Sequence, residues 1–375
     1  MIPSGEIDAV RDVARKFSAA KVAPRATELD ATGEFPYDLV AEMGQLGFFG
    51  MLVSEEHGGS GLGYMSYSAV VEEVAYAESG VSINITDQTL TASCIANFAS
   101  KELQKEWLPP MMTGEVLGAF GLTEPESGSD SGSLKTTARR DGGDWVITGS
   151  KQFITNVGTD ISKVIVVLAR TELGNSMFLV PLDAPGVEIG KAYHKMGWRC
   201  SNTAPVSFDN VRIPAANLMG EEGRGLKGML NMLNGGRIGV SSNAIGVARS
   251  CLDISVEYAR ERRQFGRPIG DFQVTQFKLA EMATNLELAR LITHKAAALA
   301  DAGLPCATES SMAKFFSTRS AKLAADEAVQ IAGGNGFMED HPASRLWRTV
   351  KVLEIGEGTN EIQRLLIARS LGFRS

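Results

Sequence analysis

The spacing of apolar residues changes twice along the chain, and this change restricts the possible folds more than any other feature of the sequence. Up to about residue 118, apolar positions recur three and four residues apart, as in 8–14, 37–49 and 66–77, and an apolar run covers 88–98. Such spacing puts the apolar side chains on one side of a helix. We therefore predict that this first part of the chain is helical.

Between about residues 119 and 222 the apolar residues fall instead into short runs rich in β-branched side chains, at 145–148, 152–155, 163–168 and 177–180. The segment Asp141-Gly142-Gly143-Asp144 is a strong turn signal among them. The gaps between these runs are too short for crossover helices, so we expect antiparallel strands in a barrel or a sandwich.

The helical spacing returns from about Gly225, in runs at 226–262, 272–302, 307–331 and 360–371. Long helices with few breaks predict a bundle. The predicted fold class is therefore mainly α, with a small β domain in the middle of the chain.

The charge balance and the scattered cysteines restrict the possible partners. A formal net charge of −7 opposes nucleic acid as the main partner, because phosphate binding needs a basic face. No apolar run is long enough for a membrane span, and residues 1–16 lack the apolar core of a signal peptide, which favours the cytoplasm. The cysteines and histidines have no metal-binding spacing, so we expect reduced thiols and no metal site.

The segment Gly223-Arg224-Gly225-Leu226-Lys227-Gly228 matches the dinucleotide-binding pattern G-x-G-x-x-G. That pattern requires a preceding strand within a βαβ unit and an acidic residue about 20 positions later. Here a loop is expected at 213–217, and no parallel β unit surrounds the glycines. We therefore interpret the segment as a flexible turn into a helix.

Three polar or glycine-rich segments could hold a ligand. Residues 120–130 place small hydroxyl residues beside Gly128, where backbone N–H groups can approach an anionic or heteroaromatic group, unless the segment is only a linker. Residues 258–268 place arginines near a helix end, where they either pair with pyrophosphate or form a solvated basic face. The glycines of 330–337 either only end a helix or permit close approach of a ligand.

Glu357 lies between two glycines, immediately before a helix that Thr359 or Asn360 would cap. Its carboxylate has little cover from neighbouring side chains and can project into a cleft. In an apolar cleft, loss of hydration would raise the pKa of Glu357 towards the range useful for a general base. The alternative is a glutamate that only favours the helix dipole.

Together these four segments, in this order around a β domain, resemble the acyl-CoA dehydrogenase family over essentially the whole chain. The resemblance implies an N-terminal α-helical domain over 1–118, a middle antiparallel β-barrel over 119–222 and a C-terminal four-helix bundle over 223–375. It also implies a homotetramer that holds FAD between subunits, an acyl-CoA substrate, and an electron-transferring flavoprotein as electron acceptor.

The resemblance assigns the cofactor contacts to two main groups of residues. In the first, Thr123 lies near the pyrimidine edge of the flavin, Phe153 stands where tryptophan is usual, and Phe120 stands where tyrosine is common in some relatives. This group comprises Phe120, Leu122, Thr123, Gly128, Ser129, Phe153, Ile154 and Thr155. The second group, which binds the FAD of the neighbouring subunit, comprises Arg262, Gln264, Phe265, Phe272, Gln273, Gln330, Ile331, Gly333 and Gly334. Thr359 and Glu361 match positions near the ADP half of the cofactor.

In enzymes that resemble this chain, the thioester lies between the flavin and the catalytic glutamate. The resemblance implies that Glu357 removes the proton next to the carbonyl while a hydride leaves the next carbon for flavin N5. The N–H of Glu357 and a ribityl hydroxyl would polarise the thioester oxygen. Substrate contacts are implied for Ser129, Asn234, Arg237, Gly356 and Gly358.

Two glycines bear on the substrate. Some relatives carry the base at the position of Gly236, which cannot serve here, so Glu357 is the candidate base and long-chain or isovaleryl-type base placement is disfavoured. Gly356 stands where many straight-chain enzymes carry tyrosine. Space left there would favour a short branched or cyclic acyl group, unless a neighbouring side chain fills it.

Three other functions stay open on sequence grounds. The chain could be a flavin oxidase or monooxygenase of the same fold, which rapid reoxidation in air would reveal. It could act on an acyl-carrier-protein thioester in a secondary pathway. It could also be a non-enzymatic binding protein, for example one that associates with DNA, although the acidic charge and the intact Glu357 oppose this.

Overall fold

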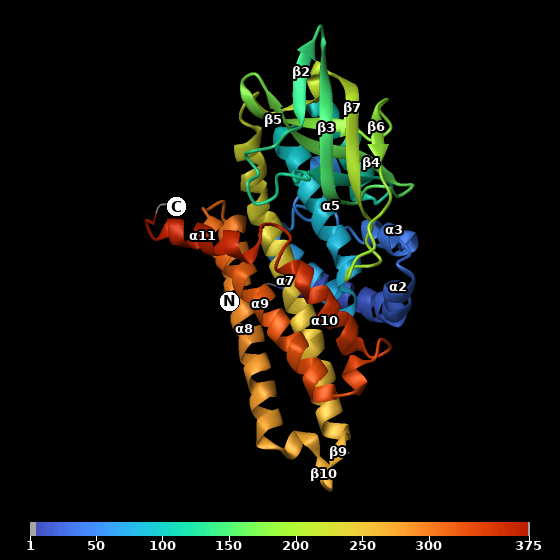
Figure 1. The fold of residues 1–375 in the computed structure, drawn as a ribbon, viewed down its shortest axis with the longest axis vertical. Coiled ribbons are helices and arrows are strands. Elements are labelled where there is room, and N and C mark those ends of the chain that lie inside the picture. Colours follow the sequence, from blue (N-terminus) through green and yellow to red (C-terminus); the bar gives the residue numbers. More distant parts are fainter. Residues whose placement is uncertain (1–4, 374–375) are drawn as a thin grey trace.

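The computed structural model describes residues 5–373, so the outermost positions of the two predicted outer domains, 1–4 and 374–375, lie outside the described residues. Figure 1 shows the β sheet at one end of the molecule and the N-terminal helices near the middle of the molecule. The long C-terminal helices reach the other end. Within residues 5–373, no helix is both long enough and apolar enough to cross a membrane.

Helices form the N-terminal part, as the spacing of apolar residues predicts. They are α1 Gly5–Phe17, α2 Ala26–Thr32, α3 Tyr37–Gln45, α4 Gly63–Ala77, α5 Ser79–Phe98 and α6 Lys101–Met112, with a π-helical turn at Ser18–Val22 and 3₁₀ turns at Ala23–Arg25 and Glu55–His57. The predicted buried helix at 88–98 is the second half of α5. Glu78 caps α5, because its carboxylate accepts a hydrogen bond of 3.0 Å from the N–H of Gly80.

The middle of the chain forms one sheet whose strand order is β6-β7-β3-β2-β4-β5-β8, with β1 beside β4. The strands are β1 Leu117–Gly121, β2 Thr137–Asp141, β3 Asp144–Thr155, β4 Ser162–Thr171, β5 Gly174–Pro181, β6 Val187–Ile189, β7 Thr203–Pro214 and β8 Leu218–Met219. The predicted turn at 141–144 joins β2 to β3. One side of the sheet packs on α5, where Val164 and Val166 meet Ala92 and Ile95.

Three details of the β prediction were wrong. The end strands β6 and β8 are not paired with each other, so the sheet is not a closed barrel. In addition, β1 runs parallel to β4, and Thr137 pairs with Arg170 in parallel. The chain traverses two other strands between β1 and β4, which provides the long connection that a parallel pair needs. The predicted strands at 145–148 and 152–155 are one strand, β3, whose register shifts after Lys151.

The C-terminal part consists of long helices. They are α7 Gly225–Glu261, α8 Gln273–Asp301, α9 Ala307–Ala332, α10 Pro342–Leu353 and α11 Asn360–Ser370, with a hairpin of β9 Arg263–Gln264 and β10 Arg267–Pro268 between the first two. 3₁₀ turns lie at Ala215–Asn217, Ile269–Asp271 and Asn335–Phe337.

The fourth helix of the bundle is not the one that the apolar runs identify. α10, which those runs miss, packs on α7 and α9, whereas the predicted helix at 360–371 is α11 and packs on α9. α10 has two local signals that could have revealed it. Pro342 occupies its first turn, and the His341 side chain accepts a hydrogen bond from the N–H of Ala343.

The turn predicted at Gly223–Gly228 is confirmed. The strand before it, β8, pairs antiparallel with β5, so no βαβ unit exists there, and α7 begins at Gly225. The expected loop at 213–217 is in fact the end of β7 followed by a 3₁₀ turn.

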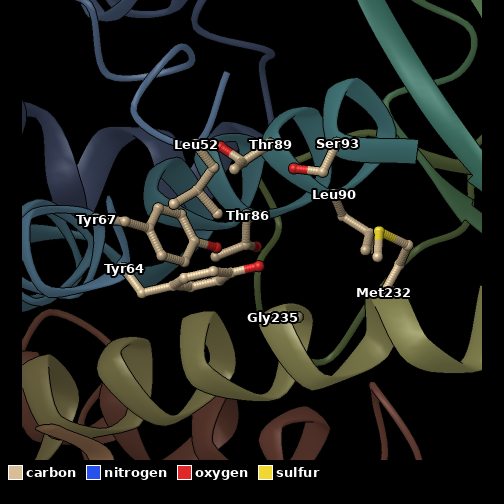
Figure 2. Close-up of a pocket in the computed structure, with 10 residues that line it drawn as sticks. Leu52, Tyr64, Tyr67, Thr86, Thr89, Leu90, Ser93, Met232 and Gly235 are labelled. Carbon is tan, nitrogen blue, oxygen red and sulfur yellow. The ribbon is translucent and has the colours of Figure 1, made fainter. Parts of the chain in front are cut away.

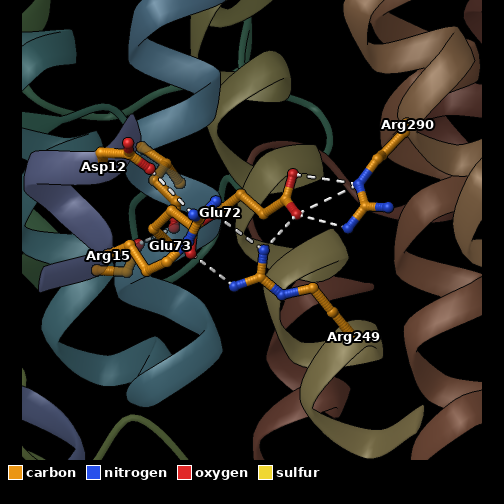
Figure 3. Close-up of polar contacts among 8 residues, drawn as sticks. Asp12, Arg15, Glu72, Glu73, Arg249 and Arg290 are labelled. Atoms are coloured by element: carbon orange, nitrogen blue, oxygen red, sulfur yellow. Dashed lines mark hydrogen bonds and ion pairs between the residues drawn. The ribbon is translucent and has the colours of Figure 1, made fainter. Parts of the chain in front are cut away.

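A buried cluster of charges joins the N-terminal helices to the bundle (Figure 3). Glu72 of α4 accepts hydrogen bonds from Arg290 of α8 at 2.7 Å and from Arg249 of α7 at 3.0 Å. Arg249 also bonds to Glu73 at 2.8 Å. Burial would raise the pKa of the Glu72 carboxyl, but Arg290 and Arg249 hold it below its usual value. This pairing fixes α4 against α7, where the site described next is built.

Candidate active site

Glu357 lies in a tight turn between α10 and α11 that other parts of the bundle hold in place. Its φ angle is 55° and that of Gly358 is 84°, so both residues have left-handed backbones, which are uncommon for a glutamate. Gln363 donates hydrogen bonds to the carbonyls of Glu357 at 3.2 Å and Gly358 at 2.8 Å. Thr359 caps α11, as one of the two predicted alternatives, by accepting a bond from the N–H of Ile362. A strained residue held by several contacts is characteristic of a functional site.

Lys314 of α9 also stabilises the turn that contains Glu357. Its ammonium group is buried and donates to the carbonyl of Glu354 and to Oδ1 of Asn360, both at 3.1 Å. Burial lowers the pKa of Lys314 to about 7, although the negative charges of Glu357 and Glu354 act to raise it.

The carboxylate of Glu357 projects into the protein and has an unused oxygen. Oε2 is buried and accepts no hydrogen bond within the described part of the chain. Burial raises the pKa of Glu357, while the charges of Arg237 and Lys314 act in the opposite direction. A buried carboxylate with a raised pKa and a free lone pair has the properties of a general base.

A pocket lies beside this carboxylate, between α4, α5 and α7 (Figure 2). Gly236 of α7 is part of its wall and touches Glu357, because a Cβ added there would stand 2.5 Å from Oε2. The residues that line the pocket are Leu52, Tyr64, Tyr67, Thr86, Thr89, Leu90, Ser93, Met232, Gly235 and Gly236.

The loop after β1 is held against β3 by a buried ion pair. Glu124 accepts hydrogen bonds from Lys151 at 2.7 Å and from the N–H of Thr136 at 3.1 Å. The N–H of Gln152 donates to the carbonyl of Thr123 at 2.9 Å, which fixes Thr123 beside the strand. Gly128 and Ser129 lie further out on the loop and are exposed, and nothing lies within 4 Å of a Cβ added to Gly128.

The irregular part of β3 presents an aromatic ring to the outside. Phe153 has a left-handed φ of 61° at the register shift, and it is 60% exposed. Its ring leans on Tyr193, with centroids 5.4 Å apart. Irregular strand positions commonly redirect a side chain at a functional site. The exposed ring and the open loop beside it fit a flat heteroaromatic group that stacks on one side.

Sequence models of three domains match this chain: the acyl-CoA dehydrogenase N-terminal domain at residues 4–115, the middle domain at 119–211 and the C-terminal domain at 223–372. The chain belongs to the acyl-CoA dehydrogenase family. It is therefore an oxidoreductase, and the family is FAD-dependent.

Similar proteins extend over nearly the whole chain. A probable acyl-CoA dehydrogenase of Bacillus subtilis, YngJ, is 43% identical, with 96% of this chain and 97% of that protein covered. The mitochondrial short-chain specific acyl-CoA dehydrogenase of Rattus norvegicus is 41% identical, with 96% and 89% covered.

Solved structures agree with this fold. Butyryl-CoA dehydrogenase from Megasphaera elsdenii has a TM-score of 0.96 at 36% identity, with 100% of both chains covered. A chain from the structure of the electron transferring flavoprotein of Acidaminococcus fermentans has a TM-score of 0.96 at 38% identity, with 99% of each covered. A glutaryl-CoA dehydrogenase from Mycobacterium smegmatis, in complex with FADH2, has a TM-score of 0.95 at 31% identity, with 100% of this chain and 96% of that one covered.

The structure brings together only part of the predicted cofactor residues of this acyl-CoA dehydrogenase family member. Thr155 of β3 lies near Asp87, whose carboxyl also interacts with the charge of Glu357. The second predicted group lies elsewhere, at the hairpin β9–β10, the start of α8 and the end of α9, which is the opposite end of the bundle (Figure 1).

The two groups lie at different ends of the bundle. α10, whose 12 residues span about 18 Å, connects the segment after α9 to the turn of Glu357. Phe265, at the tip of the hairpin, is 93% exposed, and its ring meets Phe272 edge-on at 6.1 Å. Ile331 differs from the rest of its group, because its side chain packs partly against the bundle core.

Of the predicted substrate residues, Asn234, Arg237, Gly356 and Gly358 lie near Glu357, whereas Ser129 lies on the exposed loop after β1. Arg237 is buried and donates to Oδ1 of Asn234 at 2.8 Å, while its Nε has no partner among the described residues. A Cβ added to Gly356 would meet only the carbonyl of Val352, at 3.6 Å, so the space predicted there is open. Thr359 and Glu361 lie at the start of α11, close to the Glu357 turn.

Sequence reasoning missed Asp87, which faces the same region from α5. Its carboxyl interacts with the Thr155 hydroxyl, and burial together with the Glu357 charge raises the pKa of Asp87 to about 8. The local signal was present, because Asp87 is the one charged residue in the sequence of Ser79–Phe98. Within residues 5–373, no group of three or more histidine, cysteine, aspartate or glutamate residues is placed to hold a metal ion.

Proposed function

We propose that this protein is an FAD-dependent dehydrogenase that oxidises the bond between the α and β carbons of a short acyl-CoA thioester, with Glu357 as the base. The buried Oε2 of Glu357, which has no partner among the described residues and lies against Gly236 in the wall of a pocket, is the observation that carries this proposal. The identity to short-chain specific enzymes supports a short acyl group.

The residues present fit FAD. The exposed Phe153 ring, the Thr123 backbone that lies against β3, and the hydroxyl of Thr155 surround an open surface where a flavin ring can lie. When bound, FAD supplies the acceptor for the electron pair that leaves the β carbon.

The protein's own residues prepare the α-proton transfer. Glu357 is held in one orientation by the Lys314 and Gln363 contacts to its turn, so its carboxylate needs little reorganisation to reach the proton. Its raised pKa makes it a stronger base, and Arg237 and Lys314 limit how far the pKa rises, so that the carboxylate form stays accessible. Arg237 is also placed to attract the anionic parts of the CoA chain.

The assembly proposed here is a homotetramer. The second group of cofactor residues lies at the end of the bundle opposite the Glu357 turn, so we propose that it serves the FAD of a neighbouring copy. The exposed aromatic ring of Phe265 is the kind of side chain that becomes buried in such an interface. We propose an electron-transferring flavoprotein as the electron acceptor, a cytoplasmic location, and CoA rather than a carrier protein as the thioester carrier.

The test is anaerobic titration of the purified yellow protein with propionyl-, butyryl-, isobutyryl-, 2-methylbutyryl-, octanoyl- and palmitoyl-CoA, followed by the loss of flavin absorbance. We expect the short straight or branched thioesters to bleach the flavin fastest, because Gly356 leaves room beside the base. The variant Glu357→Gln should keep its FAD and lose bleaching. If no thioester bleaches the wild-type flavin, the proposed reaction is wrong. Fast reoxidation in air without an acceptor would indicate an oxidase.

A further inference from the structure

The pocket beside Glu357 is unusually rich in hydroxyl groups for a site that takes a hydrocarbon. Five of its ten lining residues carry a hydroxyl. They come from two helices that cross above α7 (Figure 2): Tyr64 and Tyr67 of α4, and Thr86, Thr89 and Ser93 of α5.

Two of these hydroxyls have no partner. Oγ1 of Thr89 and Oγ of Ser93 are buried and make no hydrogen bond within the described part of the chain. Hydroxyls in helices usually bond to a carbonyl one turn earlier, as Thr91 of the same helix does to Asp87 at 2.9 Å. A buried hydroxyl without a hydrogen-bond partner lowers the stability of the folded protein. Two such groups in one pocket wall therefore indicate a polar partner that arrives with a ligand.

The two tyrosines complete a set of neutral donors. The hydroxyl groups of Tyr64 and Tyr67 can approach α7 closely because glycines face them there. A Cβ on Gly235 would stand 2.7 Å from the Tyr64 oxygen, and one on Gly239 would overlap the Tyr67 oxygen. Burial raises the pKa of Tyr64 to about 12 and that of Tyr67 well above its usual value. Both phenols therefore stay protonated at neutral pH and can donate a hydrogen bond.

Charge and size restrict the ligand group further. None of the residues that line the pocket is cationic, and the carboxylate of Glu357, which lies against Gly236 of the wall, opposes an anionic acyl tail. The cavity is about 10 Å³, close to the space that one water molecule needs. The pocket thus suits a single neutral polar atom better than a long or charged chain.

We propose that this pocket selects acyl thioesters that carry a neutral oxygen, such as a ketone or alcohol, on the carbon next beyond the two that react. The hydroxyls of Thr89 and Ser93, with the phenols of Tyr64 and Tyr67, are the donors available to that oxygen, which accepts from one or two of them. This proposal rests on the proposed function, because it places the thioester beside Glu357.

The experiment compares two thioesters of equal heavy-atom count, 4-oxopentanoyl-CoA and 4-methylpentanoyl-CoA, in which an oxygen replaces a methyl group. Their dissociation constants are measured by calorimetry on the Glu357→Gln holoenzyme, so that turnover does not interfere. A site built around hydrogen bonds to an oxygen should reject the methyl analogue, since that analogue leaves the donors unpaired. We expect the oxo compound to bind about 10-fold or more tightly.

Variants assign this preference to the hydroxyls. The change Thr89→Val with Ser93→Ala, in the same background, should reduce the preference to about 3-fold or less, mainly by weakening binding of the oxo compound. Thr91→Val is the matched control, since its hydroxyl bonds to the α5 backbone and lies outside the pocket, and it should keep the preference. Ser93→Ala alone serves if the double variant does not fold.

Equal or tighter binding of 4-methylpentanoyl-CoA to the otherwise unchanged pocket overturns the proposal. If butyryl-CoA still bleaches the wild-type flavin in that case, the dehydrogenase function stands and only the polar preference fails. If neither compound binds and no thioester bleaches the flavin, both the preference and the proposed function fail.

Discussion

The carboxylate of Glu357 lies directly against Gly236 of α7, so that a Cβ on Gly236 would stand 2.5 Å from Oε2. The proposed base and position 236 are therefore neighbours in space, although they are 121 positions apart in the sequence. Glycine at 236 is what leaves room for the glutamate.

The first prediction follows from this contact. Gly236→Ala should displace the Glu357 carboxylate and lower kcat about 100-fold, because a misplacement of about 1 Å at the reacting atoms costs this much. FAD content should not change. Gly143→Ala, in the turn between β2 and β3, is the control, since nothing lies within 4 Å of a Cβ added there, and its kcat should stay within a few-fold of wild type. Equal losses in both variants would contradict the contact as the cause.

The second prediction concerns Lys314. Lys314→Met removes two hydrogen bonds that hold the Glu357 turn, and only the N–H of Asn360 then donates to the Glu354 carbonyl and only Thr318 Oγ1 to Oδ1 of Asn360. We expect the free energy of unfolding to fall by about 2–4 kcal/mol and kcat to fall with it. Lys322→Met, on the same helix, breaks only an ion pair at 3.7 Å in which the lysine is 45% exposed, and it should be nearly neutral in chemical denaturation. A Lys314→Met variant with wild-type stability and activity would show that the Glu357 turn keeps its conformation without the Lys314 hydrogen bonds.

The third prediction is a pH dependence of stability. The folded pKa of Asp87 is about 8 against an ordinary 3.8, so the folded protein binds more protons than the unfolded one between these values. Stability due to Asp87 is then present below pH 3.8 and is lost as the pH rises towards 8. Asp87→Asn cannot ionise, so it avoids this loss. The difference in free energy of unfolding between Asp87→Asn and wild type should therefore grow by a few kcal/mol, in favour of the variant, from pH 5 to pH 8. A constant difference across that range, measured by thermal unfolding, would mean that Asp87 ionises normally.

The fourth prediction tests the proposed assembly. Phe265→Ala removes an exposed ring that we place against a neighbouring copy and its FAD. FAD affinity should therefore weaken about 10-fold or more, and the tetramer should dissociate at higher protein concentrations than the wild-type tetramer does. Light scattering and FAD content measure both effects. Leu173→Ala, at an exposed turn of the sheet between β4 and β5, changes a comparably exposed side chain and should alter neither. A Phe265→Ala protein with normal FAD content and size would place the interface elsewhere.

The helices at 226–262, 272–302 and 307–331 could be predicted within a few residues, because helical periodicity and its ends are local properties of the sequence. The parallel β1–β4 pair could not, since local alternation does not encode which strands become neighbours. α10 was missed because its charged residues interrupt the apolar run and only its Pro342 and His341 start signals remain.

The sequence by itself identified Glu357, its flanking glycines and the family, because these are patterns of residues close together in the chain. Only the tertiary structure decided what surrounds that carboxylate. It brings Gly236, Arg237, Lys314 and Asp87 close to Glu357 from three other helices. It also places the Tyr64 hydroxyl against Gly235. Burial and charge at a site are sums over such distant neighbours, so the pKa of the base and the polarity of its pocket exist only once the helices have packed.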